Sequence, residues 1–535
     1  MKENSFQSQA GRGFLFISSA KIYFLITSAL VNLGLPRIFG NPSDYGDYRV
    51  VSNFLSIVTM VIITGTMQAV SRLVSERPAA ALGVVGRTCL THLFIGAPAF
   101  LIFFFLAGPI AERCFADANL APAIRAASFV ILFYSFYSVI VGALNGLKRF
   151  SSQAALDATF STLKTGFIIG LTAASFGVTG AFYGFSAASF LILMISLLFL
   201  KRIPGSEAAD HAGGRTAYFL IPLLGYTLIT NLLILLDVIL LKYAVTTRFA
   251  EIFAQPGGME KAGDALYSMN IAAPSGDFAG KSVSLSASWA GSFISGIMGA
   301  AKNLSLLSYQ SVIPVAIVFF PIVAHSSHLA KGEEKERQIN GALKFSAMLA
   351  AFVMVLISSE PLGILRMLFG EEYAPAAAPL ILLAVSVYFF SIFYVSNALL
   401  TSCGFPRAAL VCGAGAISVT VSLTAAAAFY AELGAAYFVI FSSAICLGML
   451  FSFVASLALL GRFSGARIGL KPVVKITGGA LILAVLLNLF NVVEFHLVVL
   501  KIFSGGVLFT AFLFLSKELT TGDIAALKKA VRKRG

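Results

Sequence analysis

The 535-residue sequence has few charged residues and few residues that bind metals or form disulfides. Only 12% of its residues are charged and 58% are hydrophobic, which leaves too little polar surface for a soluble domain of this size. The five cysteines lie far apart and form no Cys-x-x-Cys pair, so neither a disulfide framework nor a zinc site is expected. The five histidines are equally scattered, and even His325 and His328, which share a helical face, have no carboxylate beside them. We therefore expect no metal and no other cofactor.

Long apolar runs, in contrast, fill most of the chain. A helix needs about 20 apolar residues to cross roughly 30 Å of hydrocarbon, and each run reaches or approaches that length. The pattern predicts an all-α polytopic membrane protein with about fourteen transmembrane helices. The predicted helices span residues 14–36, 49–71, 88–108, 122–144, 153–174, 179–200, 217–243, 292–324, 342–359, 376–400, 407–429, 434–460, 472–491 and 496–515.

The net charge of +14 would suggest nucleic acid as a partner in a soluble protein, but its distribution favours another explanation. Most of the lysines and arginines fall in segments that are cytoplasmic if the N-terminus is cytoplasmic. We therefore predict that both termini are cytoplasmic and that nucleic acid is not a partner. The basic tail, residues 517–535, is expected to lie against anionic lipids.

An internal repeat divides the chain. The turn at Gly146 is followed by Lys148 and Arg149 and, one helix later, by Gly180-Ala181; the turn at Gly404 is followed by Arg407 and, one helix later, by Gly434-Ala435. Two parallel halves of this kind predict alternating access around a shared cavity. The predicted parts are an N-lobe with helices 1–6 (11–203), a C-lobe with helices 7–12 (214–461), helices 13 and 14 (470–516), and the tail (517–535).

Residues 244–288 are predicted to form an outside-facing insertion in the C-lobe. The segment is rich in Gly, Ala and Ser and nearly balanced in charge, whereas the other outside connections are short. Two interpretations remain open. It is a lid or a surface for a periplasmic partner, or it is a tolerated insertion without a role of its own.

Three lysines lie inside apolar segments, where a charged group costs roughly 3 kcal/mol or more at the bilayer centre. Lys164 is the deepest, about 18 Å along its helix at ~1.5 Å per residue. Asp157 precedes it by seven residues and shares its helical face, so we predict either a polar stripe that lines a cavity or a structural ion pair. Lys302 and Lys21 are shallower, and each either lines the cavity or reaches the membrane surface.

Two further charged residues are candidates for functional roles. Arg49 begins the second helix and is either a gate residue or an arginine at the membrane surface. Asp237 lies near the end of the seventh helix. It has three interpretations: pairing with Lys302, binding a coupling proton or sodium ion, or lying at the membrane surface as a simple carboxylate.

The order of several motifs resembles a known family, the polysaccharide-type transporters of the multidrug, oligosaccharidyl-lipid and polysaccharide exporter superfamily. These motifs are the turn at residues 42–48 (Pro-Ser-Asp-Tyr-Gly-Asp-Tyr), the end of helix 2 at 65–76, the segment 142–150, and Phe320-Pro321. The resemblance covers about residues 10–516, and the insertion at 244–288 departs from the usual pattern. Each motif is loose, so the resemblance rests on their order and on the helix count.

The resemblance implies a two-lobed, V-shaped flippase in the bacterial inner membrane. It would move an undecaprenyl-diphosphate-linked oligosaccharide between leaflets, coupled to protons, sodium or the membrane potential. Helices 1 and 8 line the cavity in that family, which favours roles for Lys21 and Lys302. In the lipid II flippases the last two helices are thought to form a groove for the lipid tail. A diphosphate carries about two negative charges, for which Lys and Arg are suitable counter-charges.

Rival functions remain at this stage. A lipid II flippase for peptidoglycan shares the fold, as does a multidrug exporter, although three intramembrane lysines suit cationic drugs poorly. A membrane glycan polymerase or ligase would need an acid/base pair, which the charged residues of 244–288 do not clearly supply. A scaffold that recruits a partner through the same segment is a further alternative. The expected partners of a flippase are a lipid-linked oligosaccharide and membrane lipids.

Overall fold

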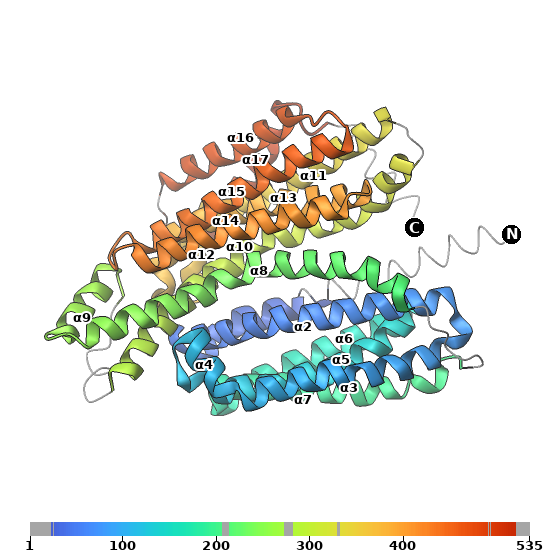
Figure 1. The fold of residues 1–535 in the computed structure, drawn as a ribbon. Helices are drawn as coiled ribbons and strands as arrows, with labels where there is room; N and C mark the ends of the chain where they lie inside the picture. Colours follow the sequence, from blue (N-terminus) through green and yellow to red (C-terminus); the bar gives the residue numbers. More distant parts are fainter. Residues whose placement is uncertain are drawn as a thin grey trace. The chain divides into compact units, whose positions relative to one another are not determined.

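The computed structural model describes residues 23–24, 26–205, 213–271, 282–328, 332–490, 492 and 494–520. Within these ranges helices are the only regular secondary structure, which confirms the predicted all-α fold (Figure 1). The described residues form two compact units. The first comprises residues up to Ala250 together with 282–296, and the second comprises 251–281 and the residues from Ile297 onward.

The first unit is built around α5 (Ala121–Gly146), which packs against α2, α3 and α7. Its core includes Tyr137, Leu144, Phe160 and Ile192, all nearly inaccessible to solvent. Asn41 caps α2 by accepting a hydrogen bond from the Asp44 amide at 2.8 Å, and Pro42 occupies the first turn. The other helices are Ile26–Phe39, α2 (Pro42–Glu76), α3 (Ala81–Phe105), α4 (Ala107–Phe115), α6 (Phe150–Leu171), α7 (Gly177–Leu197), α8 (Gly213–Phe253) as far as residue 250, and the start of α10 (Val283–His328), with short 3-10 turns including η2 (Ala118–Leu120).

The second unit is built around α13 (Ala377–Ser402), which packs against α11, α14 and α15. Both C-terminal helices, α16 and α17, pack against α11. A glycine also lets α16 and α17 pack closely against each other: a Cβ at Gly479 would lie 2.1 Å from the Phe512 ring. The elements are α9 (Gly258–Ser268), α10 from Ile297, α11 (Gly332–Ser359), α12 (Pro361–Leu368), η5 (Glu371–Ala376), α13, α14 (Pro406–Tyr430), α15 (Tyr437–Ser464), α16 (Leu470–Asn488) and α17 (Phe495–Leu515).

Twelve helices of the described residues are long and apolar enough to cross a membrane, against about fourteen predicted. One of the twelve, Phe150–Leu197, contains both α6 and α7, which pack against each other. The chain reverses between them at Ser175 and Gly177, whose φ angles are 67° and 60°. The predicted first segment corresponds in part to the shorter apolar helix Ile26–Phe39. The predicted apolar segments therefore map onto helices, the first one only in its described part.

Much of the 244–288 segment is helical rather than an open connection. It contains the last turns of α8, which continues to Phe253, then α9 and the first turns of α10. Residues such as Thr246, Arg248 and Glu251 lower the hydropathy without opposing a helix, so an apolar run ends where the helix does not. Residues 272–281 lie outside the described part, and the role of the segment as a partner surface stays a prediction.

Candidate functional site

Lys164 lies on α6 between two aromatic rings. Its Nζ atom is 5.2 Å from the ring centroid of Phe24 and 5.2 Å from that of Phe185 on α7, both within cation–π range. Among the residues that the structure describes, no carboxylate forms an ion pair with this ammonium group. Lys164 is therefore a partly buried cation whose charge is met by ring faces and remains available to an anion.

The polar stripe predicted on α6 contains more than Lys164. Asp157 lies on the same face, two turns away, and is close to the phenol groups of Tyr134 and Tyr137 on α5. Two turns correspond to about 10 Å along the helix, which is too far for a direct ion pair with Lys164. Buried oxygens of Gln153 and Ser161 on this face have no hydrogen-bond partner among the described residues. The stripe is thus polar along several turns.

Arg49 is a second buried cation of the first unit. It is 7% exposed, and its Nη1 atom donates a long hydrogen bond of 3.4 Å to the Asn32 side-chain oxygen. Its Nε atom is buried and has no hydrogen-bond partner among the described residues. Asn32 follows Phe24, the Lys164 contact, by about two helical turns on the same N-terminal segment. That segment therefore contacts both cations.

The other predicted site residues are less informative. Lys302 is 2% exposed in the second unit, and Asp237 is 7% exposed in the first, where its Oδ1 atom accepts a hydrogen bond from the Val238 amide at 2.9 Å. Both side chains are therefore buried rather than at a surface, but their pairing stays a prediction. Lys21 lies outside the described residues.

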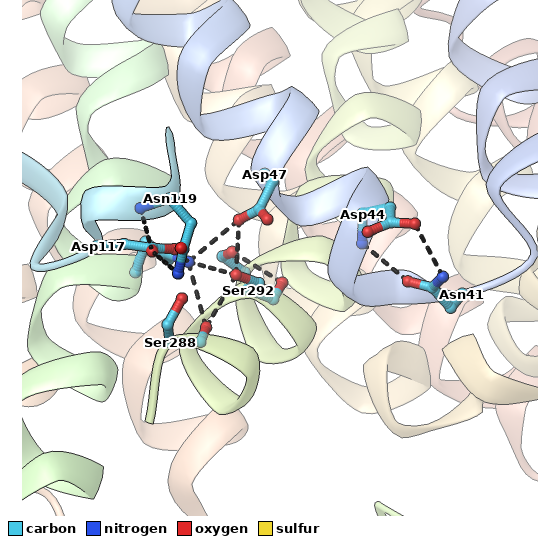
Figure 2. Close-up of polar contacts among 9 residues, drawn as sticks. Asn41, Asp44, Asp47, Asp117, Asn119, Ser288 and Ser292 are labelled. Atoms are coloured by element: carbon cyan, nitrogen blue, oxygen red, sulfur yellow. Dashed lines mark hydrogen bonds and ion pairs between the residues drawn. The ribbon is translucent and has the colours of Figure 1, made fainter. Parts of the chain in front are cut away.

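A buried ionic cluster, which the sequence did not reveal, surrounds Lys242 of α8. Its ammonium group lies 2.7 Å from Asp117 Oδ2 and 3.1 Å from Asp47 Oδ1, and it also contacts the Ser288 carbonyl oxygen and the Ser292 hydroxyl. Figure 2 shows these groups converging from α2, the α4–η2 connection and α10. Lys242 is fully buried. We call these five residues the Lys242 cluster.

Glycines bring the helices of this cluster unusually close together. A Cβ at Gly46 of α2 would lie 1.9 Å from the Ser292 carbonyl oxygen, and one at Gly296 of α10 would lie 1.9 Å from the Pro42 carbonyl oxygen. Gly291 similarly approaches Thr246 of α8. The start of α10 is therefore in direct backbone contact with α2. Because of this contact, no larger residue fits at Gly46 or Gly296 without a shift.

Asp117 caps η2 and lies outside the membrane-spanning helices. Burial raises the pKa of this carboxyl, but the Lys242 ammonium and hydrogen bonds from Lys242, Ser288 and Asn119 outweigh it, so the pKa lies below its ordinary value of 3.8. A lowered folded-state pKa stabilises the protein above that ordinary value. The stabilisation is lost as the pH falls through the folded-state pKa.

This shift predicts how acid affects stability. Asp117→Asn is expected to melt below the wild type at pH 7, and the difference should shrink as the pH falls below 3.8, where the wild-type carboxyl also becomes protonated. Thermal melting of both proteins between pH 7 and pH 3 measures it, with Asp264→Asn on the exposed surface of α9 as control. A melting difference that does not change with pH would contradict the assignment.

Comparison with known proteins agrees with this architecture. Residues 35–258 match the model of a family described as "Polysaccharide biosynthesis protein". The predicted resemblance to polysaccharide-type transporters is confirmed. The matched segment contains Asp47, Lys164 and Lys242, so the α6 stripe and most of the Lys242 cluster lie within the family's pattern. No curated protein matches this sequence.

Several solved transporter structures share the fold of this chain. The lipid II flippase MurJ in its inward closed conformation is 14% identical, with a TM-score of 0.66 over 94% of this chain and 99% of that one. An inward-facing MATE family multidrug resistance transporter is 13% identical, with a TM-score of 0.58 over 82% and 98%. A MOP superfamily transporter from Pyrococcus furiosus is 14% identical, with a TM-score of 0.52 over 85% and 96%. The prediction of a multi-pass membrane protein agrees with this shared fold and with the twelve apolar helices of the described residues.

Proposed function

We propose that this protein is a flippase that moves an undecaprenyl-diphosphate-linked oligosaccharide across the bacterial inner membrane by alternating access. The proposal rests on the family match and on one observation in particular. Lys164 is a cation within a membrane-spanning helix, and its contacts in the described structure are aromatic rings rather than a carboxylate. Such a group lowers the cost of moving a diphosphate through hydrocarbon, because it supplies a charge-assisted hydrogen bond at mid-membrane.

Other features of the first unit support the same function. The Nε atom of Arg49 is a buried donor without a partner in the described residues, and guanidinium groups suit phosphate oxygens. The hydroxyl and amide groups of the α6 stripe suit a hydrated glycan, because their hydrogen bonds replace those that water would make. A multidrug exporter would need acidic groups for cationic substrates, and Lys164 repels such substrates.

The experiment is a flipping assay in proteoliposomes. A fluorescent undecaprenyl-diphosphate oligosaccharide is placed in both leaflets, and an impermeant quencher reports the fraction that exchanges. We expect exchange well above that of protein-free vesicles. Lack of exchange with every lipid-linked glycan tested would overturn the proposal, and the appearance of a new glycosidic bond would indicate a polymerase or ligase instead.

A lipid II flippase is the second candidate, and one observation favours it. The lipid II flippase structure matches 94% of this chain, whereas the MATE structure matches 82%. Both candidate lipids contain a diphosphate, so Lys164 does not separate them. The same assay separates them when unlabelled lipids compete with fluorescent lipid II. We expect the unlabelled oligosaccharide lipid to inhibit the exchange of fluorescent lipid II more strongly than unlabelled lipid II does.

A further inference from the structure

The Lys242 cluster has more pairs of polar atoms at hydrogen-bond distance than it has hydrogens to donate. The Lys242 ammonium lies within reach of Asp47 Oδ1, Asp117 Oδ2, the Ser288 carbonyl and the Ser292 hydroxyl. The Ser292 Oγ atom also lies 2.6 Å from Asp47 Oδ1 and 2.8 Å from the Ser288 carbonyl oxygen. Six donor–acceptor pairs therefore share four hydrogens, three from the ammonium and one from the hydroxyl.

One added proton makes up part of this deficit. A protonated Asp47 donates to Ser292 Oγ, which frees the Ser292 hydrogen for the Ser288 carbonyl. The ammonium hydrogens then serve Asp117 and the remaining oxygens. The hydrogen bonds of the cluster thus favour a carboxylic acid, rather than a carboxylate, at Asp47.

The charges of the cluster also indicate that Asp47 is the protonated residue. One ammonium and two carboxylates carry a net charge of −1, and a low-dielectric environment disfavours that excess. Asp117 retains its charge because its oxygens accept from Lys242 and from the backbone and side chain of Asn119. The side chain of Asp117 is 1% exposed and that of Asp47 is 21% exposed. Asp47 is therefore the carboxyl that can exchange a proton with water.

The cluster also connects three helices at the point where α10 begins. It attaches the first turns of α10 to α2 and α8, while α10 from Ile297 onward belongs to the second unit. The backbone contact at Gly46 and Gly296 depends on the same attachment. These residues lie at the ends of the predicted apolar segments that the distribution of lysine and arginine places outside the cytoplasm.

We propose that the Lys242 cluster is a proton-operated latch. With Asp47 protonated, the cluster is neutral and holds the start of α10 against α2 and α8; transfer of that proton to water leaves a charge of −1 and releases α10. The charged groups facing Asp47 are Lys242 from α8 and Asp117 from the α4–η2 connection, and α10 contributes the Ser292 hydroxyl. Asp44 of α2 pairs with Asn41 instead (Figure 2). The latch does not depend on which lipid is carried.

Hydrogen exchange in nanodisc-embedded, full-length protein tests the latch. Amide exchange of residues 283–296 is divided by that of α5 in the same sample, which removes the intrinsic effect of pH on exchange. In the wild type we expect this ratio to rise between pH 5 and pH 9, by up to tenfold per pH unit, because the closed form binds one proton more than the open form. A ratio that stays constant with pH overturns the proposal without any variant.

Two variants refine the test. Asp47→Asn imitates the protonated acid, so its ratio should stay low at every pH. Asp44→Asn makes the same chemical change three residues away, outside the cluster, and should retain the wild-type pH dependence. The proposal fails if Asp47→Asn keeps the pH dependence, or if Asp44→Asn abolishes it. Flipping activity is not part of this readout, so the latch and the proposed function fail separately.

Discussion

Lys242→Met is expected to lower the stability of the protein by roughly 3–5 kcal/mol at pH 7, because it leaves the buried Asp117 carboxylate without the cation that neutralises it. Lys242 is fully buried, and the Asp117 side chain is 1% exposed, so water cannot replace the ammonium without opening the helices. Methionine has nearly the same length, which keeps the packing loss small. Thermal melting of the purified protein in detergent measures the loss.

The control removes the charges together. A triple variant, Lys242→Met with Asp47→Asn and Asp117→Asn, has no buried charge in the cluster and should recover most of the lost melting temperature. If Lys242→Met melts like the wild type, the ammonium does not neutralise the Asp117 carboxylate. If the triple variant melts no higher than Lys242→Met, the loss reflects packing rather than charge.

Glu360→Ala is expected to have an effect of similar size in the second unit, again roughly 3–5 kcal/mol. Glu360 is 2% exposed and forms an ion pair with Lys501 of α17, which is 9% exposed and also donates to the Phe490 carbonyl oxygen. This pair attaches α17 to the start of α12. Without the carboxylate, the lysine retains only carbonyl contact, and α17 should loosen first.

Hydrogen exchange of residues 495–515 measures this loosening alongside thermal melting. The matched control is Glu360→Gln with Lys501→Met, which removes both charges and should restore much of the protection. Arg366→Gln provides a surface comparison, since its pair with Glu371 is largely exposed and should contribute about 1 kcal/mol or less. Equal protection of α17 in Glu360→Ala and the wild type would contradict the assigned role of the pair.

Apolar run length was enough to predict the long apolar helices of this protein. Hydrocarbon imposes that length whatever the packing, so even the reversal between α6 and α7 falls where Ser175 and Gly177 separate two apolar runs. The 244–288 segment shows the limit of the method. Hydropathy reports contact with lipid, whereas the last turns of α8 and the whole of α9 are helical without being strongly apolar.

The candidate sites also differ in whether the sequence alone reveals them. Lys164 was identifiable because a lysine deep in one apolar run is anomalous by itself. Lys242, Asp47 and Asp117 each lie near the end of a predicted apolar segment, where a charge is ordinary, and only the fold brings them together. A partial signal existed: Asp47 is the second aspartate of the 42–48 turn that carries the family resemblance, and Gly46 beside it permits the contact with α10.

The central claim is that a partly buried cation in α6, Lys164, assists the movement of an anionic lipid-linked glycan. Its most direct test is the initial exchange rate of the diphosphate-linked oligosaccharide in proteoliposomes containing Lys164→Gln, Lys164→Arg or the exposed-surface control Lys261→Gln. A charge-assisted hydrogen bond of about 1.5–3 kcal/mol predicts a loss of roughly tenfold or more for Lys164→Gln. Lys164→Arg should retain most of the rate and Lys261→Gln all of it. Exchange by Lys164→Gln at the wild-type rate would contradict the claim.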